Sequence, residues 1–345
     1  MAAPLDVSGI AAPLQRFVAA HYGAKARVAA LAPMALGHAG LTYGFDVVEG
    51  DSAVLARIVL KLAPPGVRRH GNTDVYRQAP LLRALRQQGQ PVPNVPWASP
   101  DEDWFGTPFI MMERLPGLPC LIWDPDPQFP RTAPAMATVW RDTARALADL
   151  HEVDWRRHLA GWEQPRPLSE EVLRWDPVLA KAQEPDWLQA GQRVRELVLR
   201  HMPQGEPLGL VHGDYQPGNV LFDGAATESR LTGIVDWELS SIGAQLLDLG
   251  WMMMMADRRS WHDSFRAVLP PEPEELAEVY QAHRGKRFAD IDWYCAFAGY
   301  RFGAICCLNV RLHRTGKRPD PLWEKFALAV PFLFGRAEQI LAARG

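Results

Sequence analysis

Val211-His212-Gly213-Asp214-Tyr215-Gln216-Pro217-Gly218-Asn219-Val220-Leu221-Phe222 is the stretch that decides the fold of this 345-residue chain. Apolar, strand-like residues lie on both sides of a turn that presents Asp214 and, five positions later, Asn219. Further along, Ile234-Val235-Asp236-Trp237-Glu238 brings another carboxylate to the end of a second strand-like run. Two acids and an amide at the ends of buried strands predict one polar site.

Phosphoryl transfer uses this set of side chains. One carboxylate orients the attacking hydroxyl and accepts its proton, while an amide oxygen and another carboxylate hold Mg²⁺. The step from Asp214 to Asn219, with His212 before it, equals the spacing in the protein-kinase motif. Singly, each residue is more often a turn former or a strand cap, but the combination is rare. We therefore predict Asp214 as the catalytic base and Asn219 and Asp236 as metal ligands.

On these motifs the chain resembles the aminoglycoside phosphotransferase/choline kinase-like small-molecule kinases, a branch of the protein-kinase-like fold. His212-Gly213-Asp214-x4-Asn219 and Asp236-Trp237-Glu238 carry the resemblance, and Asp248 matches the structural Asp that follows. The chain is most similar to the kinase-like domain of acyl-CoA dehydrogenase family members 10 and 11. The resemblance extends from about Leu31 to Ile340 and implies transfer of the γ-phosphate of ATP to a small-molecule hydroxyl.

The implied fold is α+β and bilobal, with a small N-terminal β-rich lobe and a larger, mostly helical C-terminal lobe. The domains are expected at 1–115, with the phosphate loop and lysine, and at 116–345, with the catalytic and metal-binding loops and the substrate pocket. Apolar spacing agrees, because two strands, a helix and a further strand are predicted before about residue 115 and helices dominate from about 133. A glycine-bearing turn and a short strand are predicted within 36–48, strands at 54–62, 109–113, 208–211 and 231–235, and helices at 74–87, 136–151, 187–201 and from 246, 274, 293 and 322.

The resemblance also assigns a nucleotide site. Lys61 contacts the α- and β-phosphates, Gly37, Gly40 and Thr42 belong to the loop over them, and backbone groups of Met112 and Glu113 bind adenine. The cofactors implied are ATP and Mg²⁺. From the residues alone, a lysine ending an apolar strand is more often a solvated charge. The glycine spacing is neither G-x-G-x-x-G nor a P-loop, so the loop is weak evidence by itself.

Gln78 is a departure from the resembled family, which places a Glu on the first helix to pair with the lysine. An amide hydrogen-bonds an ammonium but supplies no counter-charge, so Lys61 is expected to be held less firmly. Arg77, next to Gln78, leaves a slipped alignment open. One hypothesis is therefore a nucleotide-binding pseudokinase with weak activity, against which the intact Asp214, Asn219 and Asp236 weigh.

The remaining interpretations differ in the small molecule that accepts the phosphate. The branch that the chain resembles points to a hydroxyacyl compound. Its acidic groups would be met by Arg301, Arg311, His313 and Arg314. The alternative is an aminoglycoside, a polycation that needs an acidic rim such as residues 271–278. That run is also typical of an ordinary acidic first helical turn. A protein substrate is disfavoured because no Ala-Pro-Glu segment follows Asp236.

Composition excludes other classes. With 37 basic and 40 acidic residues, a formal net charge of −3 argues against a general nucleic-acid binder. The N-terminal residues lack the pattern of a secretory signal, and no apolar stretch reaches the roughly 18 residues of a membrane helix. We therefore expect a cytoplasmic protein with neither nucleic-acid nor membrane partners. Oligomeric state and the choice between ATP and GTP are not predicted.

Overall fold

The computed structural model describes residues 6–34, 41–50, 53–205, 207–224 and 230–344. The chain forms two compact units. Unit 1 comprises residues 1–116, 156–162 and 232–239, and unit 2 comprises residues 117–155, 163–231 and 240–345. Two later segments therefore return to the unit that the N-terminal part begins.

The helices and strands follow the predicted class, with strands early and helices late. The strands are β1 (Ala26–Pro33), β2 (Leu41–Glu49), β3 (Ala53–Leu62), β4 (Trp97–Ser99), β5 (Phe109–Glu113), β6 (Leu118–Pro119), β7 (Leu208–Val211), β8 (Val220–Asp223), β9 (Arg230–Ile234) and β10 (Ser241–Ala244). The helices are α1 (Val7–Tyr22), α2 (Gln78–Gln87), α3 (Ala133–Leu150), α4 (Trp155–His158), α5 (Leu168–Leu173), α6 (Asp176–Leu179), α7 (Pro185–Arg200), α8 (Leu246–Ala256), α9 (Pro273–His283), α10 (Ile291–Arg314) and α11 (Leu322–Ala342).

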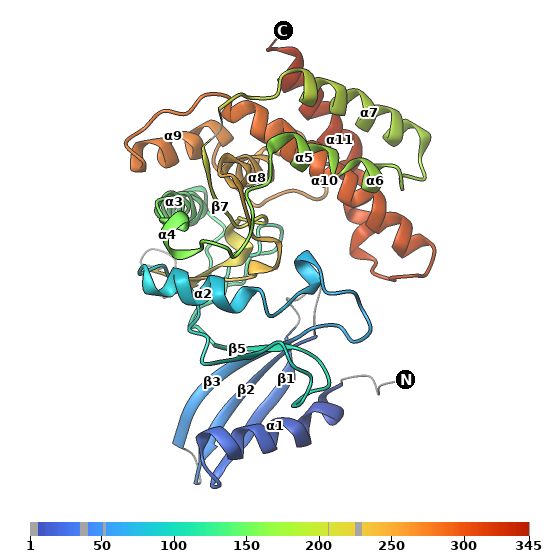
Figure 1. Ribbon diagram of the computed structural model, residues 1–345. Coiled ribbons are helices and arrows are strands. Elements are labelled where there is room, and N and C mark those ends of the chain that lie inside the picture. The colour runs from blue at the N-terminus through green and yellow to red at the C-terminus, as the bar shows by residue number, and fades with distance from the viewer. Residues whose placement is uncertain (1–5, 35–40, 51–52, 206, 225–229, 345) are drawn as a thin grey trace. The chain divides into compact units, whose positions relative to one another are not determined.

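Unit 1 is built on a five-stranded antiparallel sheet in the order β1-β2-β3-β5-β4. Helix α1 lies across one face of this sheet (Figure 1). Its buried residues Ile10, Leu14, Phe17 and Val18 join a core with the sheet residues Phe45, Leu60 and Phe109. The core fixes strand β3, and with it the position of Lys61.

The expectation of only strands and turns before residue 74 was wrong, because α1 is a 16-residue helix. Asp6 caps it, accepting a hydrogen bond from the Gly9 N–H over 2.8 Å. Strands β1 and β4 were also not predicted. Helix α2 begins at Gln78 rather than at Asp74, and Pro80 fits in its first turn because the N–H groups there have no intrahelical partner.

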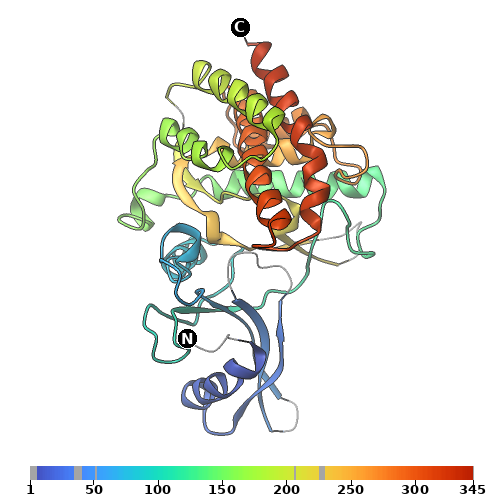
Figure 2. The ribbon, with the colours of Figure 1, turned by 90° about the vertical axis from the view of Figure 1, so that its right-hand side faces the viewer.

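Unit 2 is mainly helical. The 24-residue helix α10 packs against α8 and α11, and Figure 2 shows α10 and α11 side by side. Gly250 on α8 allows the close approach, since a Cβ there would lie 2.4 Å from backbone atoms of Tyr294. The approach of α8 to α10 brings Trp251 and Arg301 into contact, which matters for the site.

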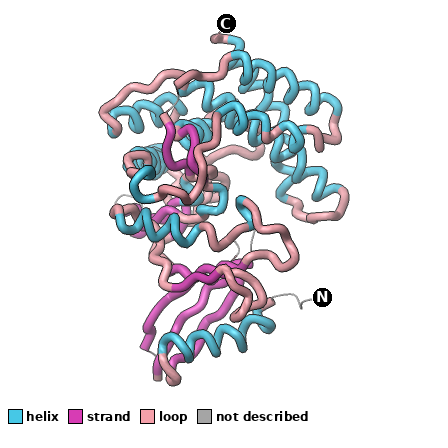
Figure 3. Tube along the Cα trace, in the orientation of Figure 1, coloured by secondary structure: helices cyan, strands magenta, loops and turns pink. Residues whose placement is uncertain are grey.

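Short strands in unit 2 support the loop of residues 212–219. Strand β7 pairs antiparallel with β10, and β6 pairs with β8, so strands border the loop at both ends. Figure 3 shows β7 as a short magenta segment among the cyan helices of unit 2. No helix in the described ranges combines the length and apolarity needed to cross a bilayer.

Candidate active site

Asp214 lies in unit 2, three residues beyond β7, and N–H donors hold both of its carboxylate oxygens. Asn219 Nδ2 donates to Asp214 Oδ2 over 3.0 Å and also to the Asp214 carbonyl over 2.7 Å. The indole Nε1 of Trp251 donates to Oδ1 over 2.7 Å. The structure therefore brings two predicted site residues, Asp214 and Asn219, into direct contact and adds Trp251, which was not predicted.

The loop before Asp214 is anchored by the buried carboxylate of Asp248, the first-turn acid of α8. It accepts hydrogen bonds from the backbone N–H groups of His212, over 2.6 Å, and Gly213, over 2.8 Å. Gly213 has a φ of 92°, which side-chain-bearing residues rarely adopt. A glycine is therefore required where the chain turns, and Asp248 fixes that turn.

Asn219 presents an oxygen that suits a hard cation. Its Nδ2 is used twice by Asp214, so the amide orientation is set, and its Oδ1 receives no hydrogen bond from the described residues. The residue ends the short 3₁₀ turn Pro217–Asn219, capped by the Gln216 side chain. An amide oxygen and a carboxylate are ligands that Mg²⁺ accepts together with water and phosphate. The residues present therefore fit a magnesium ion.

Lys61 lies in unit 1 and makes two ion pairs. Its Nζ is 2.8 Å from Glu238 Oε2 and 3.3 Å from Asp236 Oδ1, and Lys61 is only 5% exposed. Burial alone would lower the pKa of the ammonium, but the negative charges of Asp236 and Glu238 outweigh it and raise that pKa. Lys61 is therefore a buried, protonated cation, in contrast to the solvated lysine that is commoner at strand ends.

The expectation that Gln78 leaves Lys61 loosely held was wrong. The counter-charge comes from Glu238, 177 residues away in sequence, with Asp236 beside it. Gln78 is itself buried, and its Nε2 has no hydrogen-bond partner among the described residues. Arg77 donates instead to the carbonyl of Glu238 over 3.4 Å. The segment after β9 therefore supplies the negative charge for Lys61 that the family places on the helix of Gln78, which is α2 here.

Two further features of unit 1 lie beside Lys61 in the structure or in its strand pairing. Asp236 has a φ of 64°, an uncommon left-handed conformation for a residue with a side chain. Thr42 pairs with Lys61 across β2 and β3, and its buried hydroxyl oxygen has no hydrogen-bond partner in the part of the chain that the structure describes. The predicted loop residues Gly37 and Gly40 lie outside the described residues.

Met112 and Glu113 lie in β5, opposite Val59 and Ile58 of β3. The Glu113 N–H donates to the Asn94 carbonyl over 2.8 Å, and the Asn94 N–H donates to Glu113 Oε2 over 3.3 Å. The N–H group of Glu113 is therefore already used inside unit 1, and an adenine contact at this residue has to come from another group.

The charged residues predicted to meet an acceptor are largely engaged with other groups of the protein. Arg301 is 5% exposed and donates to the Gly213 carbonyl over 2.6 Å, and Arg314 pairs with Glu184 and Glu324. Arg301 is therefore buried and bonded to the loop of Asp214 rather than exposed on its helix. In the acidic run 271–278, three glutamates each pair with an arginine: Glu274 with Arg259, Glu275 with Arg141, and Glu278 with Arg287.

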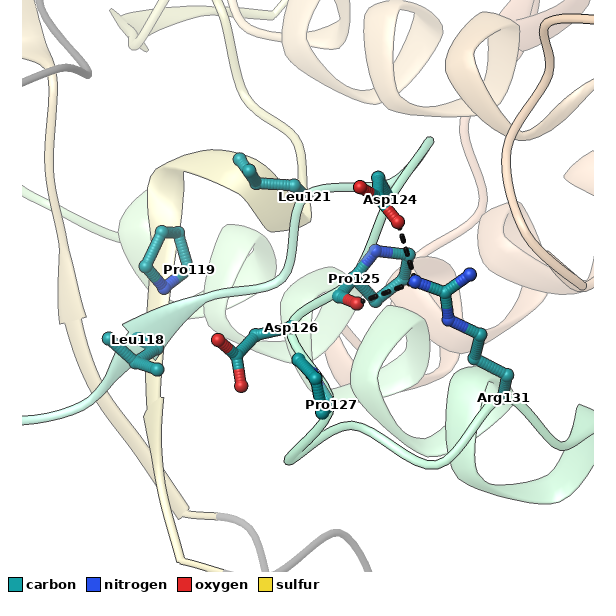
Figure 4. A pocket seen from close by; sticks show the side chains of 8 residues that line it. All are labelled: Leu118, Pro119, Leu121, Asp124, Pro125, Asp126, Pro127 and Arg131. Atoms are coloured by element: carbon teal, nitrogen blue, oxygen red, sulfur yellow. Dashed lines mark hydrogen bonds and ion pairs between the residues drawn. The ribbon is translucent and has the colours of Figure 1, made fainter.

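A cavity of about 420 Å³ lies in unit 2, beside β6 (Figure 4). Leucine and proline side chains form its walls, and Arg131, paired with Asp124, lies on one side. Its lining is Leu118, Pro119, Leu121, Asp124, Pro125, Asp126, Pro127 and Arg131. None of the predicted site residues lines this cavity, so it is not the predicted catalytic, nucleotide or metal site.

Residues 40–300 match the phosphotransferase enzyme family, three quarters of the chain. The chain belongs to this family. It resembles the probable acyl-CoA dehydrogenase IBR3 of Arabidopsis thaliana, at 31% identity over 78% of this chain and 35% of that one. Acyl-CoA dehydrogenase family member 10 of Mus musculus matches at 27% identity over 72% of this chain and 24% of that one. The predicted resemblance is thus confirmed, and the chain spans about a third or less of these two relatives.

Solved structures show the same protein-kinase-like fold, which confirms the predicted α+β class. An aminoglycoside phosphotransferase-like protein from Ralstonia eutropha JMP134 superposes with a TM-score of 0.74 at 21% identity, covering 96% of this phosphotransferase-family chain and 98% of that one. A thermostable mutant of the aminoglycoside phosphotransferase APH(4)-Ia, in a ternary complex with AMP-PNP and hygromycin B, gives a TM-score of 0.60 at 14% identity, covering 96% and 99%.

Three contacts in this phosphotransferase-family chain were not predicted from its sequence. They are those of Glu238 with Lys61, of Trp251 with Asp214, and of Arg301 with the Gly213 carbonyl. Glu238 belongs to the Asp236-Trp237-Glu238 motif, but the motif does not identify it as the partner of Lys61. Trp251 lies in the helix predicted from residue 246 but was not predicted as a site residue, and Arg301 was predicted as a substrate-facing charge. The position of Glu238, two residues from Asp236, offered a signal, whereas the roles of Trp251 and Arg301 depend on how α8 meets α10.

Proposed function

We propose that this chain transfers the γ-phosphate of ATP to a hydroxyl group of a small molecule. The observation that carries the proposal is the geometry of the 212–219 loop, in which Asn219 holds the carboxylate of Asp214 at kinase spacing. Asp214 accepts the proton of the attacking hydroxyl and orients its oxygen. Anchoring by Asp248 keeps this carboxylate placed before the substrate arrives.

The residues proposed for the nucleotide are in unit 1. Lys61 is protonated and supplies a positive charge for the phosphates, and the Thr42 hydroxyl, without a protein partner among the described residues, supplies a donor beside it. Gly37 and Gly40 are proposed for the loop over the phosphates, and Met112 and Glu113 for adenine. The complex of APH(4)-Ia with AMP-PNP supports a nucleotide in this fold.

Asn219 and Asp236 are the residues proposed to hold Mg²⁺. When bound, the ion neutralises charge on the phosphate oxygens during transfer. The Asn219 Oδ1 is available for it, because the amide nitrogen is fixed on Asp214.

We propose an acceptor that carries negative charge, such as a hydroxyacyl compound. Arg166 and Arg174 both bond the buried Glu171, over 2.8 and 3.1 Å, and Arg301 lies near enough to affect its charge. Burial would raise the pKa of Glu171, but the three guanidinium groups lower it, so the glutamate is ionised. Three cations surround one anion, and Arg301 connects this cluster to the loop of Asp214.

An aminoglycoside is the alternative acceptor. Its ammonium groups would need unpaired carboxylates, whereas Glu274, Glu275 and Glu278 are each paired with an arginine. These pairs are partly exposed and therefore weak individually, so the alternative is tested directly rather than dismissed. The weakly active pseudokinase is the other alternative, and the two carboxylate partners of Lys61 argue against it.

Calorimetric titration of ATP, with and without Mg²⁺, tests the nucleotide site. Wild type is expected to bind ATP in a Mg²⁺-dependent manner, and Asp236→Ala to lose that dependence. Asp214→Ala is expected to retain ATP affinity while transfer falls by about 10²–10⁴-fold. If the folded wild-type protein binds no nucleotide, the proposal is wrong.

Mass spectrometry after incubation with MgATP tests the acceptor. A short-chain hydroxy acid, its CoA thioester and an aminoglycoside are offered separately, and gain of one phosphoryl group is measured. Phosphorylation of the hydroxy acid or thioester is expected. Transfer to the aminoglycoside alone would reverse the acceptor assignment, and ATP binding without any product would favour the pseudokinase.

A further inference from the structure

Trp251 donates its indole N–H to a carboxylate oxygen of Asp214, and the tryptophan is only 3% exposed. Because Asn219 occupies the other oxygen, the plane of the carboxylate is defined by two N–H groups, one on each oxygen. Each of these hydrogen bonds is directional, so rotation of the carboxylate about its Cβ–Cγ bond would break both. The orientation of the Asp214 carboxylate is thereby fixed.

Arg301 in turn holds the Trp251 ring. Its guanidinium carbon lies 4.6 Å from the centroid of Trp251 and 5.1 Å from that of Trp175, so the cation is stacked against two indole rings. The same guanidinium donates to the Gly213 carbonyl. One side chain therefore contacts both the residue before Asp214 and the ring that bonds its carboxylate.

Burying the guanidinium of Arg301 costs free energy, which suggests that the charged group has a role. Burial lowers the pKa of Arg301, with Glu171 and Asp214 acting in the opposite sense, and the Nε of Arg301 has no hydrogen-bond partner among the described residues. An aliphatic residue of similar volume would fill the space between α8 and α10 without this penalty. The guanidinium is suited instead to fixing two groups at once, because it is planar and carries several donors.

We infer that Trp251 is a positioning residue for Asp214 and that Arg301 positions Trp251. Neither is assigned a contact with substrate. The inference rests on the proposed function, since it explains how the proposed base is aimed at the hydroxyl. It predicts that the indole N–H, and not the bulk of the ring, contributes to the rate.

Trp251→Phe tests this, because it keeps an aromatic ring for Arg301 and removes the N–H. The matched control is Trp261→Phe: Trp261 is also buried, and its Nε1 donates to the Met254 carbonyl over 3.1 Å rather than to Asp214. Phosphate release from MgATP, with water as the acceptor, is measured for both. Trp251→Phe is expected to lower kcat by about 10–100-fold at unchanged KM for ATP, and Trp261→Phe to leave kcat close to wild type.

Arg301→Lys keeps the positive charge but loses the planar stacking. It is expected to lower kcat in the same direction by a smaller factor, again at unchanged KM for ATP. A kcat equal to wild type would overturn the part assigned to Arg301. Equal kcat values for Trp251→Phe and Trp261→Phe would overturn the part assigned to Trp251.

An NMR readout is independent of turnover. Among the indole N–H resonances of the 13 tryptophans, the one lost in Trp251→Phe identifies Trp251. Asp214→Asn is expected to shift that resonance and to leave the Trp261 resonance in place. If the Trp251 indole resonance does not shift in Asp214→Asn, Trp251 does not bond Asp214 in solution, and the inference is wrong. If wild type releases no phosphate, the proposed function fails, and this resonance still decides whether Trp251 bonds Asp214.

Discussion

Lys61 in unit 1 and Asp214 in unit 2 are both ionisable groups at strand ends, but they are held by opposite means. Lys61 is held by charge, with two carboxylates within 3.3 Å of its Nζ. Asp214 is held by N–H groups of an amide and an indole, and its loop by backbone bonds to Asp248. The Lys61 contacts are hydrogen bonds too, but they come from an ammonium that rotates freely, whereas the planar amide and indole donors at Asp214 also fix a direction.

The difference corresponds to the proposed roles. A lysine that attracts phosphates needs its charge near them, and its orientation matters little because the ammonium is a compact point charge. A base that takes a proton from one hydroxyl needs a defined lone-pair direction. Removing an anchor of the Asp214 loop is thus expected to affect rate and folding more than removing charge around Lys61.

The largest effect is expected for Asp248→Ala. The substitution removes the carboxylate that accepts from the buried N–H groups of His212 and Gly213, and it removes the partner of His151 Nε2, 3.4 Å away. Buried polar groups left unsatisfied cost about 1–3 kcal/mol each, so together they predict a loss of about 3–5 kcal/mol in the free energy of unfolding. Urea unfolding followed by tryptophan fluorescence measures it.

Asp248→Asn is the control for this prediction, since it keeps one acceptor oxygen and the side-chain volume. It is expected to lose less stability than the alanine variant. A cost below about 1 kcal/mol for Asp248→Ala would mean that the loop of Asp214 holds its conformation without this carboxylate.

A smaller effect is expected for Lys61→Met. Glu238 is buried and loses the ammonium that pairs with it, whereas Asp236 is partly exposed and admits water, so a loss of about 1–3 kcal/mol is predicted. The pKa of Lys61 is raised in the folded state, so its contribution is fully present below the unfolded pKa and lost as pH rises through the folded one. The stability difference between wild type and Lys61→Met should shrink above about pH 10.4.

Denaturation curves of both proteins from neutral to alkaline pH test the sign. A difference that grows with alkalinity would show that the ammonium is not stabilised by its partners. ATP titration of the same variant is expected to show weakened binding, in contrast to Asp214→Ala.

The sequence predicted the proximity of Asp214 and Asn219 better than the other contacts that hold their loop. Asp214 and Asn219 are five residues apart on one loop, and local spacing determines their encounter. The strand at 109–113 was predicted with the bounds of β5, because a continuous apolar run ended by a turn is a local pattern.

Contacts between distant segments could not be predicted in the same way. Glu238 reaches Lys61 across 177 residues, and Trp251 on α8 reaches Asp214 after β7. Gly250 lets α8 approach α10, which brings Arg301 to Trp251. Helix α1 was missed for a different reason: Ile10, Leu14, Phe17 and Val18 have helical spacing, but alanines and Pro13 weaken the apolar pattern. Local pattern thus predicts elements, and packing decides which side chains meet.

The smallest effect is expected for Gln78→Leu, and it separates the two accounts of how Lys61 is held. If Gln78 took the place of a helix glutamate, its removal would loosen Lys61 and weaken ATP binding. In the structure the Gln78 Nε2 has no partner among the described residues, so a leucine of similar size removes a buried, unsatisfied donor. The free energy of unfolding should change by less than about 1 kcal/mol, or rise slightly, and the ATP Kd should stay within about twofold of wild type. Calorimetric titration beside Glu238→Gln, which removes the charge that pairs with Lys61, makes the comparison direct. A larger loss of ATP affinity in Gln78→Leu than in Glu238→Gln would mean that Gln78 of α2, and not Glu238, is the main partner of Lys61.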